Sequence, residues 1–204
     1  MLPLFCATTN DGKLREFRLA LPVEPLPGLD RIPPPEETGT TFEENAVLKA
    51  LYYSKHCDGL LFAEDSGLEV DALYGAPGVY SARFAGEAAS DEENNKLLLL
   101  RMTKQAQRSA RFVAVIALAR AGQLVKTFTG SVEGELLEAV RGKNGFGYDP
   151  VFFYPPFGCS FGEATLEMKM RVSHRSNAAR ALLAYYGTLQ RPRASQPVLP
   201  DVTA

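Results

Sequence analysis

The chain has 204 residues, of which 46% are hydrophobic and 23% are charged, so we expect a globular protein with a packed core. Its formal net charge is −2, whereas DNA-binding proteins carry an excess of Lys and Arg that neutralises phosphates. Nucleic acid is therefore not an expected partner. Three widely spaced cysteines fit neither a disulfide framework nor a zinc site. With no signal-peptide pattern and no apolar run as long as a membrane span, the sequence predicts a cytoplasmic protein without a membrane partner.

The predicted strands and helices are interspersed along the chain. Strands are expected at residues 2–7, at 59–65 and, as antiparallel neighbours joined near Ala121 and Gly122, across 110–136. A first helix is expected after the loop at 8–13, and a second from the capping box Thr41–Glu44 to about Cys57, with a stop at Gly59. A third is expected to begin at the capping box Ser90–Glu93, and a fourth to run from Ser173 to a stop at Gly187. Because a hairpin interrupts the alternation of strands and helices, the pattern indicates a mixed α/β fold.

No internal repeat or boundary divides the chain, so we expect a single domain over residues 1–189. The proline-rich segment 21–37 lies between predicted elements, and we interpret it as an ordered, extended connection. The tail over residues 190–204 is also rich in proline and has few apolar residues. We therefore expect that tail to be flexible.

The loop TTNDGK, residues 8–13, joins the first predicted strand to the first predicted helix. Backbone N–H groups at a helix start bind anions, Thr8, Thr9 and Asn10 add short polar side chains, and Lys13 adds a positive charge. The spacing lacks the first glycine and the hydroxyl residue of a Walker A motif. On spacing alone, a phosphate site and an ordinary polar helix cap both remain open.

Glu64 and Asp65 directly follow an apolar run, and we expect them to end a strand at the rim of a sheet. Adjacent strand residues face opposite ways, so only one of the two is expected to point into a site. Glu36 and Glu37 precede a predicted helix that carries Lys49. Carboxylates are ionised at neutral pH and bind Mg²⁺ through oxygen. On spacing alone, a solvated turn at residues 36–37 and no role for Glu64 remain equally open.

The segment RGKNGFGYDPVFFYPPFG, residues 141–158, places Phe146 between glycines, with Tyr148 and Asp149 just after it. An aromatic face suits stacking on a nucleobase, and a fixed carboxylate suits a base N–H group. A glycine-rich hairpin with core aromatic side chains is the alternative.

His174 and Arg175 lie in the first turn of the last predicted helix. A cation at that end of a helix opposes the helix dipole, so a merely structural Arg175 is unfavourable there. The position is reasonable if this turn faces an anionic or keto-bearing ligand. A structural histidine is the alternative for His174.

Together, these segments resemble the inosine triphosphate pyrophosphatase family, the RdgB-like nucleotidases. The matching motifs, in chain order, are TTNDGK, EETGTTFEENAVLKA, AEDSGLEVDAL, GAPGVYSARFAG, GFGYDPVFF and VSHR, and the resemblance spans about residues 2–187. The resemblance implies an elongated mixed β-sheet flanked by helices, two lobes with a central cleft, and a homodimer. It also implies hydrolysis of the purine nucleotides ITP, dITP and XTP to the monophosphate and pyrophosphate, with Mg²⁺ as cofactor.

The resemblance implies a role for each matching position. The substrate would be bound by Thr8, Thr9, Asn10, Asp11, Gly12, Lys13, Ser66, Phe146, Gly147, Tyr148, Asp149, Lys169, His174 and Arg175. The metal would be held by Asp65 and by Glu36 or Glu37, and the catalytic residues would be Asp65 and Lys49. Two positions depart from the family pattern, since Thr9 and Asn144 each stand where glycine is usual.

The implied mechanism assigns Asp65 to orient or deprotonate a water that attacks the α-phosphorus. A donor from His174 or Arg175 to a 6-keto oxygen would disfavour adenine, whose amino group leaves that donor unpaired. Two other functions remain open: a Maf-like pyrophosphatase for pyrimidine or modified nucleotides, and a nucleotide-binding protein without turnover.

Overall fold

The computed structural model describes residues 3–190, which build one seven-stranded sheet in the order β2-β1-β3-β4-β5-β6-β7. The strands are β1 (Leu4–Cys6), β2 (Glu24–Pro25), β3 (Leu60–Val70), β4 (Ser109–Arg120), β5 (Gln123–Leu136), β6 (Phe152–Tyr154) and β7 (Cys159–Ser160). β1 is parallel to both of its neighbours, β2 and β3, whereas every later pair of neighbours is antiparallel. The mixed α/β class predicted from the sequence is confirmed.

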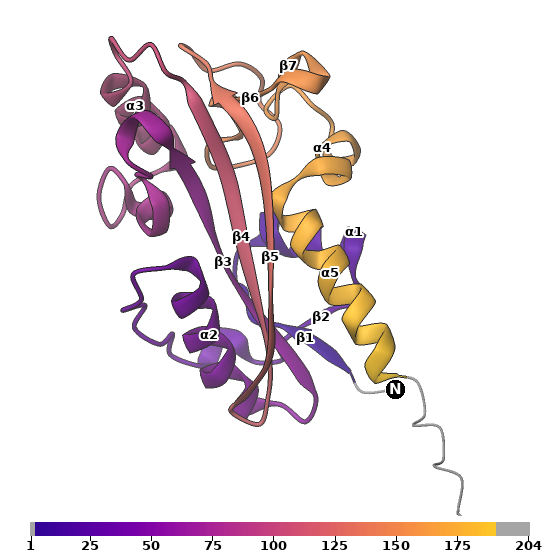
Figure 1. Ribbon diagram of the computed structural model, residues 1–204. Helices are drawn as coiled ribbons and strands as arrows, with labels where there is room; N and C mark the ends of the chain where they lie inside the picture. The colour runs from indigo at the N-terminus through magenta and orange to yellow at the C-terminus, as the bar shows by residue number, and fades with distance from the viewer. Residues whose placement is uncertain (1–2, 191–204) are drawn as a thin grey trace, which may run out of the picture.

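The helices cover both faces of the long strands β3, β4 and β5 (Figure 1). They are α1 (Asp11–Ala20), α2 (Phe42–Tyr53), α3 (Asp91–Arg101), α4 (Leu166–Val172) and α5 (His174–Leu189). In the figure, α2 lies on one side of the three strands and α5 on the other, while α3, β6 and β7 gather at the far end. No helix in the described part of the chain is both long and apolar enough to cross a membrane.

Alternation along β3 separates two hydrophobic cores. Leu60 and Phe62 pack in the core beneath α1 and α5, whereas Leu61 and Ala63 pack in the core beneath α2. A third core, at the far end of the long strands, joins β3 and β4 to α3 and β6. Since successive side chains point to opposite faces, Glu64 lies on the α5 side and its neighbour Asp65 lies on the α2 side.

β3 does not end at the acidic pair, and this sequence expectation is wrong. Glu64 and Asp65 lie in the middle of an eleven-residue strand that continues through Ser66 and Gly67, all of them paired with β4. The strand continues because the equally long β4 supplies hydrogen-bond partners up to Val70. Gly67 does not turn the chain: it leaves room for the carbonyl group of Gly78, which would lie 2.5 Å from an added Cβ atom.

Beyond Phe62, the other edge of β3 has no strand beside it in the described part of the chain. β1 ends at Cys6, opposite Phe62, and the polar loop 8–13 leads away into α1. Further along, the segment that contains Ser81 covers this edge, where the Ser81 hydroxyl accepts a hydrogen bond from the Leu68 N–H. The acidic pair therefore lies where this edge of β3 has no neighbouring strand in the described part of the chain, with one carboxylate on each face of the sheet.

The predicted helix starts are confirmed, and one predicted stop is wrong. Both capping boxes form, at Thr41–Glu44 and at Ser90–Glu93, and Ser173 caps α5. α5 runs through Gly187 to Leu189, because Gly187 keeps a helical backbone instead of the left-handed conformation that ends many helices.

The predicted hairpin between β4 and β5 also forms. Its two turn residues, Ala121 and Gly122, have φ values of 49° and 77°, as a tight two-residue turn requires. Except for Gln190, the proline-rich tail over residues 190–204 lies outside the described residues, so its predicted flexibility stays a prediction, as does the single-domain boundary at 189.

Candidate active site

A cavity of about 130 Å³ lies where the start of α1, the middle of β3, the loop before β6 and the first turn of α5 meet. Its walls include most of the residues that the sequence motifs singled out for substrate: Asn10, Lys13, Ser66, Phe146, Gly147, Tyr148, Asp149, Lys169, His174 and Arg175. A larger cavity of about 610 Å³ adjoins it, shares Phe146 and Lys169 with it, and is also lined by Gly12. Thr8, Thr9 and Asp11 line neither cavity among the described residues.

The loop before α1 forms a capped helix start with a cation beside it. Asn10 is the N-cap residue, and its side-chain oxygen accepts a hydrogen bond from the Lys13 backbone N–H at 2.9 Å. The Thr8 hydroxyl oxygen accepts one from the Asn10 N–H at 3.2 Å. The ammonium group of Lys13 lies 2.6 Å from Glu64. The loop is therefore a polar cap that also places a positive charge at a helix N-terminus, and its phosphate-binding role stays a prediction.

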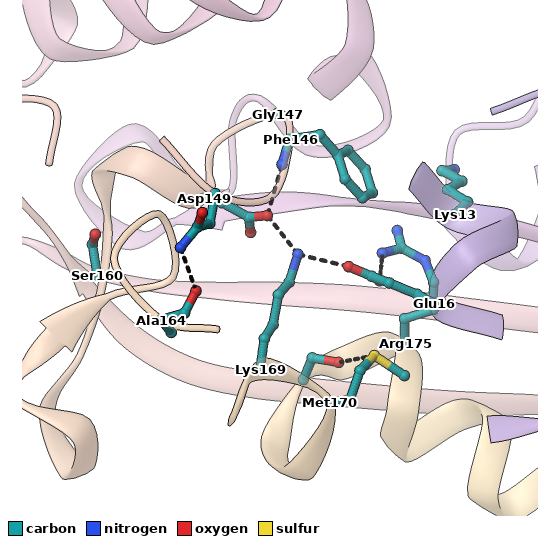
Figure 2. Close-up of polar contacts among 12 residues, drawn as sticks. Lys13, Glu16, Phe146, Gly147, Asp149, Ser160, Ala164, Lys169, Met170 and Arg175 are labelled. Carbon is teal, nitrogen blue, oxygen red and sulfur yellow. Dashed lines mark hydrogen bonds and ion pairs between the residues drawn. The ribbon is translucent and has the colours of Figure 1, made fainter. Parts of the chain in front are cut away.

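The Lys169 side chain links the carboxylate of Asp149, in the loop before β6, to Glu16 of helix α1 (Figure 2). Its ammonium group lies 2.5 Å from Asp149 and 2.8 Å from Glu16, and all three side chains are buried. The same Asp149 carboxylate accepts a hydrogen bond from the Phe146 N–H at 2.9 Å. Burial raises the pKa of Asp149, and Lys169 offsets this only in part. Through its Oδ2 atom, Asp149 thus holds the loop before β6, and its role in binding a base stays a prediction.

Arg175 continues this chain of opposite charges toward the phosphate loop. Its guanidinium group donates to Glu16 at 2.5 Å, to Glu64 at 3.0 Å and to the Ser66 hydroxyl at 3.0 Å. Because Glu64 also pairs with Lys13, positive and negative groups alternate without a break across the cavity floor. Burial alone would raise the pKa of Glu64, but Arg175 and Lys13 hold it far below its ordinary value. Glu64 is therefore a permanent anion that orients two cations.

Asp65, on the opposite face of β3, belongs to a separate polar group. Its carboxylate accepts from the Lys49 ammonium at 2.9 Å and from the Asn45 amide at 3.4 Å. Glu37 lies 3.3 Å from the same Lys49 nitrogen, so the Asp65 and Glu37 oxygens are no farther apart than those two distances together. Burial raises the pKa of Asp65 against the opposing effect of Lys49.

The two candidate metal ligands, Glu36 and Glu37, differ in their contacts. Both residues are exposed, but Glu37 lies within ion-pair distance of Lys49, and no such contact forms at Glu36 in the described part of the chain. No group of three or more His, Cys, Asp or Glu side chains gathers in a metal-binding arrangement in the described part of the chain. The donor set that does form, two carboxylates at an open edge, matches Mg²⁺, which prefers one or two carboxylates and completes its shell with water and phosphate oxygens.

His174 is buried and neutral. Its ring stacks on Phe112, with centroids 4.8 Å apart and ring planes 14° apart. Burial, followed by the charges of Arg175 and Lys169, lowers the pKa of His174 well below its ordinary value. Its Nδ1 atom has no hydrogen-bond partner within residues 3–190. The cavity wall therefore includes a histidine whose Nδ1 atom is buried and unpaired among the described residues.

Phe146 lines both cavities. Its ring centroid lies 4.9 Å from the Lys169 ammonium and 5.4 Å from the Arg175 guanidinium carbon. Gly12 makes this position possible, since an added Cβ atom there would lie 2.8 Å from the Phe146 ring. The ring is thus held over two cations, a favourable arrangement for an aromatic face.

The two departures from the family pattern have different structural consequences. Thr9 is exposed. Asn144 ties the loop before β6 to the segment that precedes α4, because its N–H donates to the Gly162 carbonyl at 2.9 Å and its side-chain amide donates to Ala164 at 3.0 Å. An asparagine at 144 therefore restrains this loop more than a glycine would.

Sequence reasoning missed Glu16 and gave Glu64 no definite role. Glu16 follows Lys13 by three residues, so the helical period places both on the same face of α1, and this spacing could have identified it. For Glu64 no local signal existed, because its partners Lys13 and Arg175 are 51 and 111 residues away in the sequence.

The fold and site define an α/β protein whose sheet carries a cation-lined cavity on one face and a lysine-bridged pair of carboxylates on the other. The chain belongs to the Ham1 family, whose model matches residues 4–185.

Named relatives of this chain cover nearly all of it. It is 48% identical over 197 residues to a dITP/XTP pyrophosphatase of Acidobacterium capsulatum, covering 90% of this chain and 97% of that protein. It is 49% identical over 185 residues to one of Deinococcus radiodurans, covering 89% and 91%. The solved structure of the Staphylococcus aureus Ham1 protein superposes with a TM-score of 0.84 at 40% identity, covering 92% of this chain and all of that one.

Proposed function

We propose that this chain hydrolyses non-canonical purine nucleoside triphosphates, namely ITP, dITP and XTP, to the nucleoside monophosphate and pyrophosphate. The observation that carries the proposal is the open edge of β3, which has a ring-binding cavity on the α5 face and the Asp65–Lys49–Glu37 group on the α2 face. A nucleotide that crosses this edge places its base in the cavity and its phosphates beside the carboxylates. The relatives named dITP/XTP pyrophosphatases support the same substrate class.

The phosphates are bound by groups on both sides of the open edge. The start of α1 and the Lys13 ammonium neutralise negative charge on one side, and Lys49 does so on the other. Asp65 orients or deprotonates the water that attacks the α-phosphorus. Its burial supports this role, because a carboxylate with a raised pKa is a stronger base than one in water.

The proposal includes Mg²⁺ as cofactor, with Asp65 and Glu37 as the protein ligands. Glu37 is favoured over the alternative ligand Glu36 because it shares Lys49 with Asp65. When bound, the ion supplies positive charge that stabilises the charge developing on the phosphate oxygens.

The base is selected by donors in the cavity wall. Arg175 uses three of its five N–H donors on Glu16, Glu64 and Ser66, which leaves others for a 6-keto oxygen, and neutral His174 has an unpaired ring nitrogen. Adenine presents a 6-amino donor instead, and each unpaired buried donor costs about 1–3 kcal/mol. GTP shares the 6-keto group, so its rejection acts at the 2-amino group, near the backbone around Asp149.

We further propose that the enzyme is a cytoplasmic homodimer.

A substrate panel tests the proposal. ITP, dITP, XTP, GTP, ATP and dTTP are incubated with and without Mg²⁺, and pyrophosphate and orthophosphate are measured separately. We expect pyrophosphate from ITP, dITP and XTP, less from GTP and ATP, and none after chelation of the metal. Orthophosphate as the first product would refute cleavage at the α-phosphorus. A preference for dTTP would favour the Maf-like alternative, and tight binding without product would favour a nucleotide-binding protein.

A further inference from the structure

Helix α3 holds the loop before β6 through a single glycine. Asp91 and Asn95 lie four residues apart and therefore on one face of the helix. The Asp91 carboxylate accepts a hydrogen bond from the Gly147 N–H at 2.6 Å, and the Asn95 side-chain amide donates one to the Gly147 carbonyl at 2.8 Å. Both backbone polar groups of Gly147 are thus bound by the same helix face.

Gly147 is a position at which the backbone needs such restraint. Its φ is +60°, in the left-handed region that glycine adopts freely, so the residue adds little stiffness of its own. Its neighbours Phe146 and Tyr148 both line the cavity. The Tyr148 hydroxyl donates to the Ser81 carbonyl at 2.8 Å, which brings it to the opposite wall. A rotation of the backbone at Gly147 would move both rings.

Stability alone does not explain Asn95. The residue is 5% exposed, and its side-chain oxygen has no partner within the described residues. A buried, unpaired carbonyl oxygen is unfavourable for folding. Turning the amide over would bring this oxygen against the Gly147 carbonyl, so the observed orientation is the one that binds the loop. The observed orientation therefore forms the hydrogen bond to the Gly147 carbonyl and leaves the Asn95 side-chain oxygen unpaired.

The adjacent Asn94 gives a matched comparison. It is also buried and lies on the same helix, but its side chain accepts from the Ala85 N–H at 2.8 Å and donates to the Ala82 carbonyl at 3.1 Å. Asn94 thus holds the segment before α3 and makes no bond to Gly147.

We propose that Asn95, assisted by Asp91, is a positioning residue for base recognition: it holds Gly147 so that Phe146 and Tyr148 present a preformed wall to the purine. The proposal rests on the function proposed above. It assigns α3 to the base end of the substrate, since the hydrogen bonds and ion pairs given for the proposed phosphate-side residues Lys13, Lys49 and Asp65 go to other elements.

The test separates binding of the base from binding of the phosphates. For wild type, Asn95→Ala and Asn94→Ala, KM and kcat are measured with ITP and Mg²⁺. The affinity for inorganic tripolyphosphate, which has no base, is measured by calorimetry without added metal. For Asn95→Ala we expect KM for ITP to rise about three- to tenfold, as for loss of one hydrogen bond, with tripolyphosphate affinity unchanged. Asn94→Ala should raise KM for ITP less, although it removes two buried hydrogen bonds.

Three outcomes would overturn the proposal: an unchanged KM for ITP, an equal loss of tripolyphosphate affinity, or an equal rise of KM in Asn94→Ala. If Asn95→Ala does not fold, Asp91→Ala decides, because Asp91 is exposed, lines the same cavity and holds the Gly147 N–H. That variant must then show the same selective rise in KM. A wild-type protein without ITP turnover would refute the proposed function itself, whereas normal wild-type turnover with unaffected variants would refute only the role of Asn95.

Discussion

Glu64 and Asp65 are neighbours on one strand, yet their surroundings give them opposite properties. Glu64 faces two cations, Arg175 and Lys13, which overcome burial and keep its pKa low. Asp65 faces mainly Lys49, which does not overcome burial, so its pKa is raised. The first carboxylate is suited to a fixed structural charge and the second to proton transfer. The alternating geometry of β3 produces this division, because it sends adjacent side chains to different faces.

Replacing Asp65 by Asn should remove turnover and leave binding largely intact. The amide keeps the size of the side chain but can neither accept a proton from water nor carry a charge. We expect kcat for ITP to fall by about 10²- to 10⁴-fold, with the dissociation constant for ITP changed only a few-fold. Steady-state kinetics and calorimetry measure the two quantities. Glu69→Gln, at a half-buried ion pair on the same strand, is the control, and near-normal turnover in Asp65→Asn would contradict the assigned role.

Replacing Glu16 by Gln should destabilise the protein in a pH-dependent manner. Burial raises the pKa of Glu16, but Arg175 and Lys169 together lower it below the ordinary value. A carboxyl group with a lowered pKa stabilises the fold fully above its unfolded pKa of about 4.3, and that contribution is lost as the pH falls through the lower folded pKa.

We therefore expect Glu16→Gln to lower the free energy of unfolding on the order of 3 kcal/mol near neutral pH, as for a broken buried ion pair. The difference from wild type should shrink below about pH 4. Urea unfolding at about pH 7, 4 and 3 measures it, with Glu138→Gln as an exposed control whose effect stays within about 0.5 kcal/mol. A difference that grows toward acid pH would contradict the assigned charge state.

Helix α5 carries two residues of the cavity wall, His174 and Arg175, and its position depends on one glycine of the sheet. Gly130 of β5 lies against the His174 carbonyl and the Ala178 nitrogen, so a Cβ atom added there would overlap both. At the other end of the same helix, Gly187 is exposed and has no atom near its missing Cβ. One glycine therefore permits close packing, and the other only weakens the helix.

Replacing Gly130 or Gly187 by alanine should change the stability of the protein in opposite directions. Gly130→Ala should cost about 1–3 kcal/mol and raise KM for ITP, because overpacking shifts the first turn of α5. Gly187→Ala should stabilise the protein by about 0.5–1 kcal/mol, because alanine favours a helix over glycine, with KM unchanged. Urea unfolding and ITP kinetics test both variants. Equal effects of the two substitutions would show that α5 is not anchored at Gly130.

At the scale of the molecule, the site joins four segments that are far apart in the sequence. The start of α1, the middle of β3, the loop before β6 and the first turn of α5 each supply one wall. A nucleotide that touches all four links the cores on both faces of the sheet. Substrate binding should therefore stabilise the whole fold and not one element.

ITP should raise the melting temperature of the catalytically impaired Asp65→Asn variant. At one hundred times its dissociation constant, a ligand stabilises the native state by about 2.7 kcal/mol. For a chain of this size this corresponds to a rise of about 5–10 °C. Differential scanning calorimetry measures it, with ATP at the same concentration as the comparison. An equal shift with ATP would contradict base selection by the donors of His174 and Arg175.

Local signals in the sequence determined the parts of this protein that depend on near neighbours. Both capping boxes, the hairpin at Ala121–Gly122 and the mixed α/β class follow from spacing and turn chemistry, and the ordered motifs pointed to the family and to most residues of the cavity wall. Such features are predictable because each depends on contacts within a few residues of the chain.

Tertiary structure alone decided the features that depend on distant partners. β3 continues past Asp65 because β4 lies beside it, and Glu37 rather than Glu36 shares the Lys49 ammonium with Asp65. The charges that bind Glu64 come from α1 and α5, and the hold on Gly147 comes from α3. These contacts join residues between 12 and 111 positions apart, and only the packing of the sheet brings them within reach of one another.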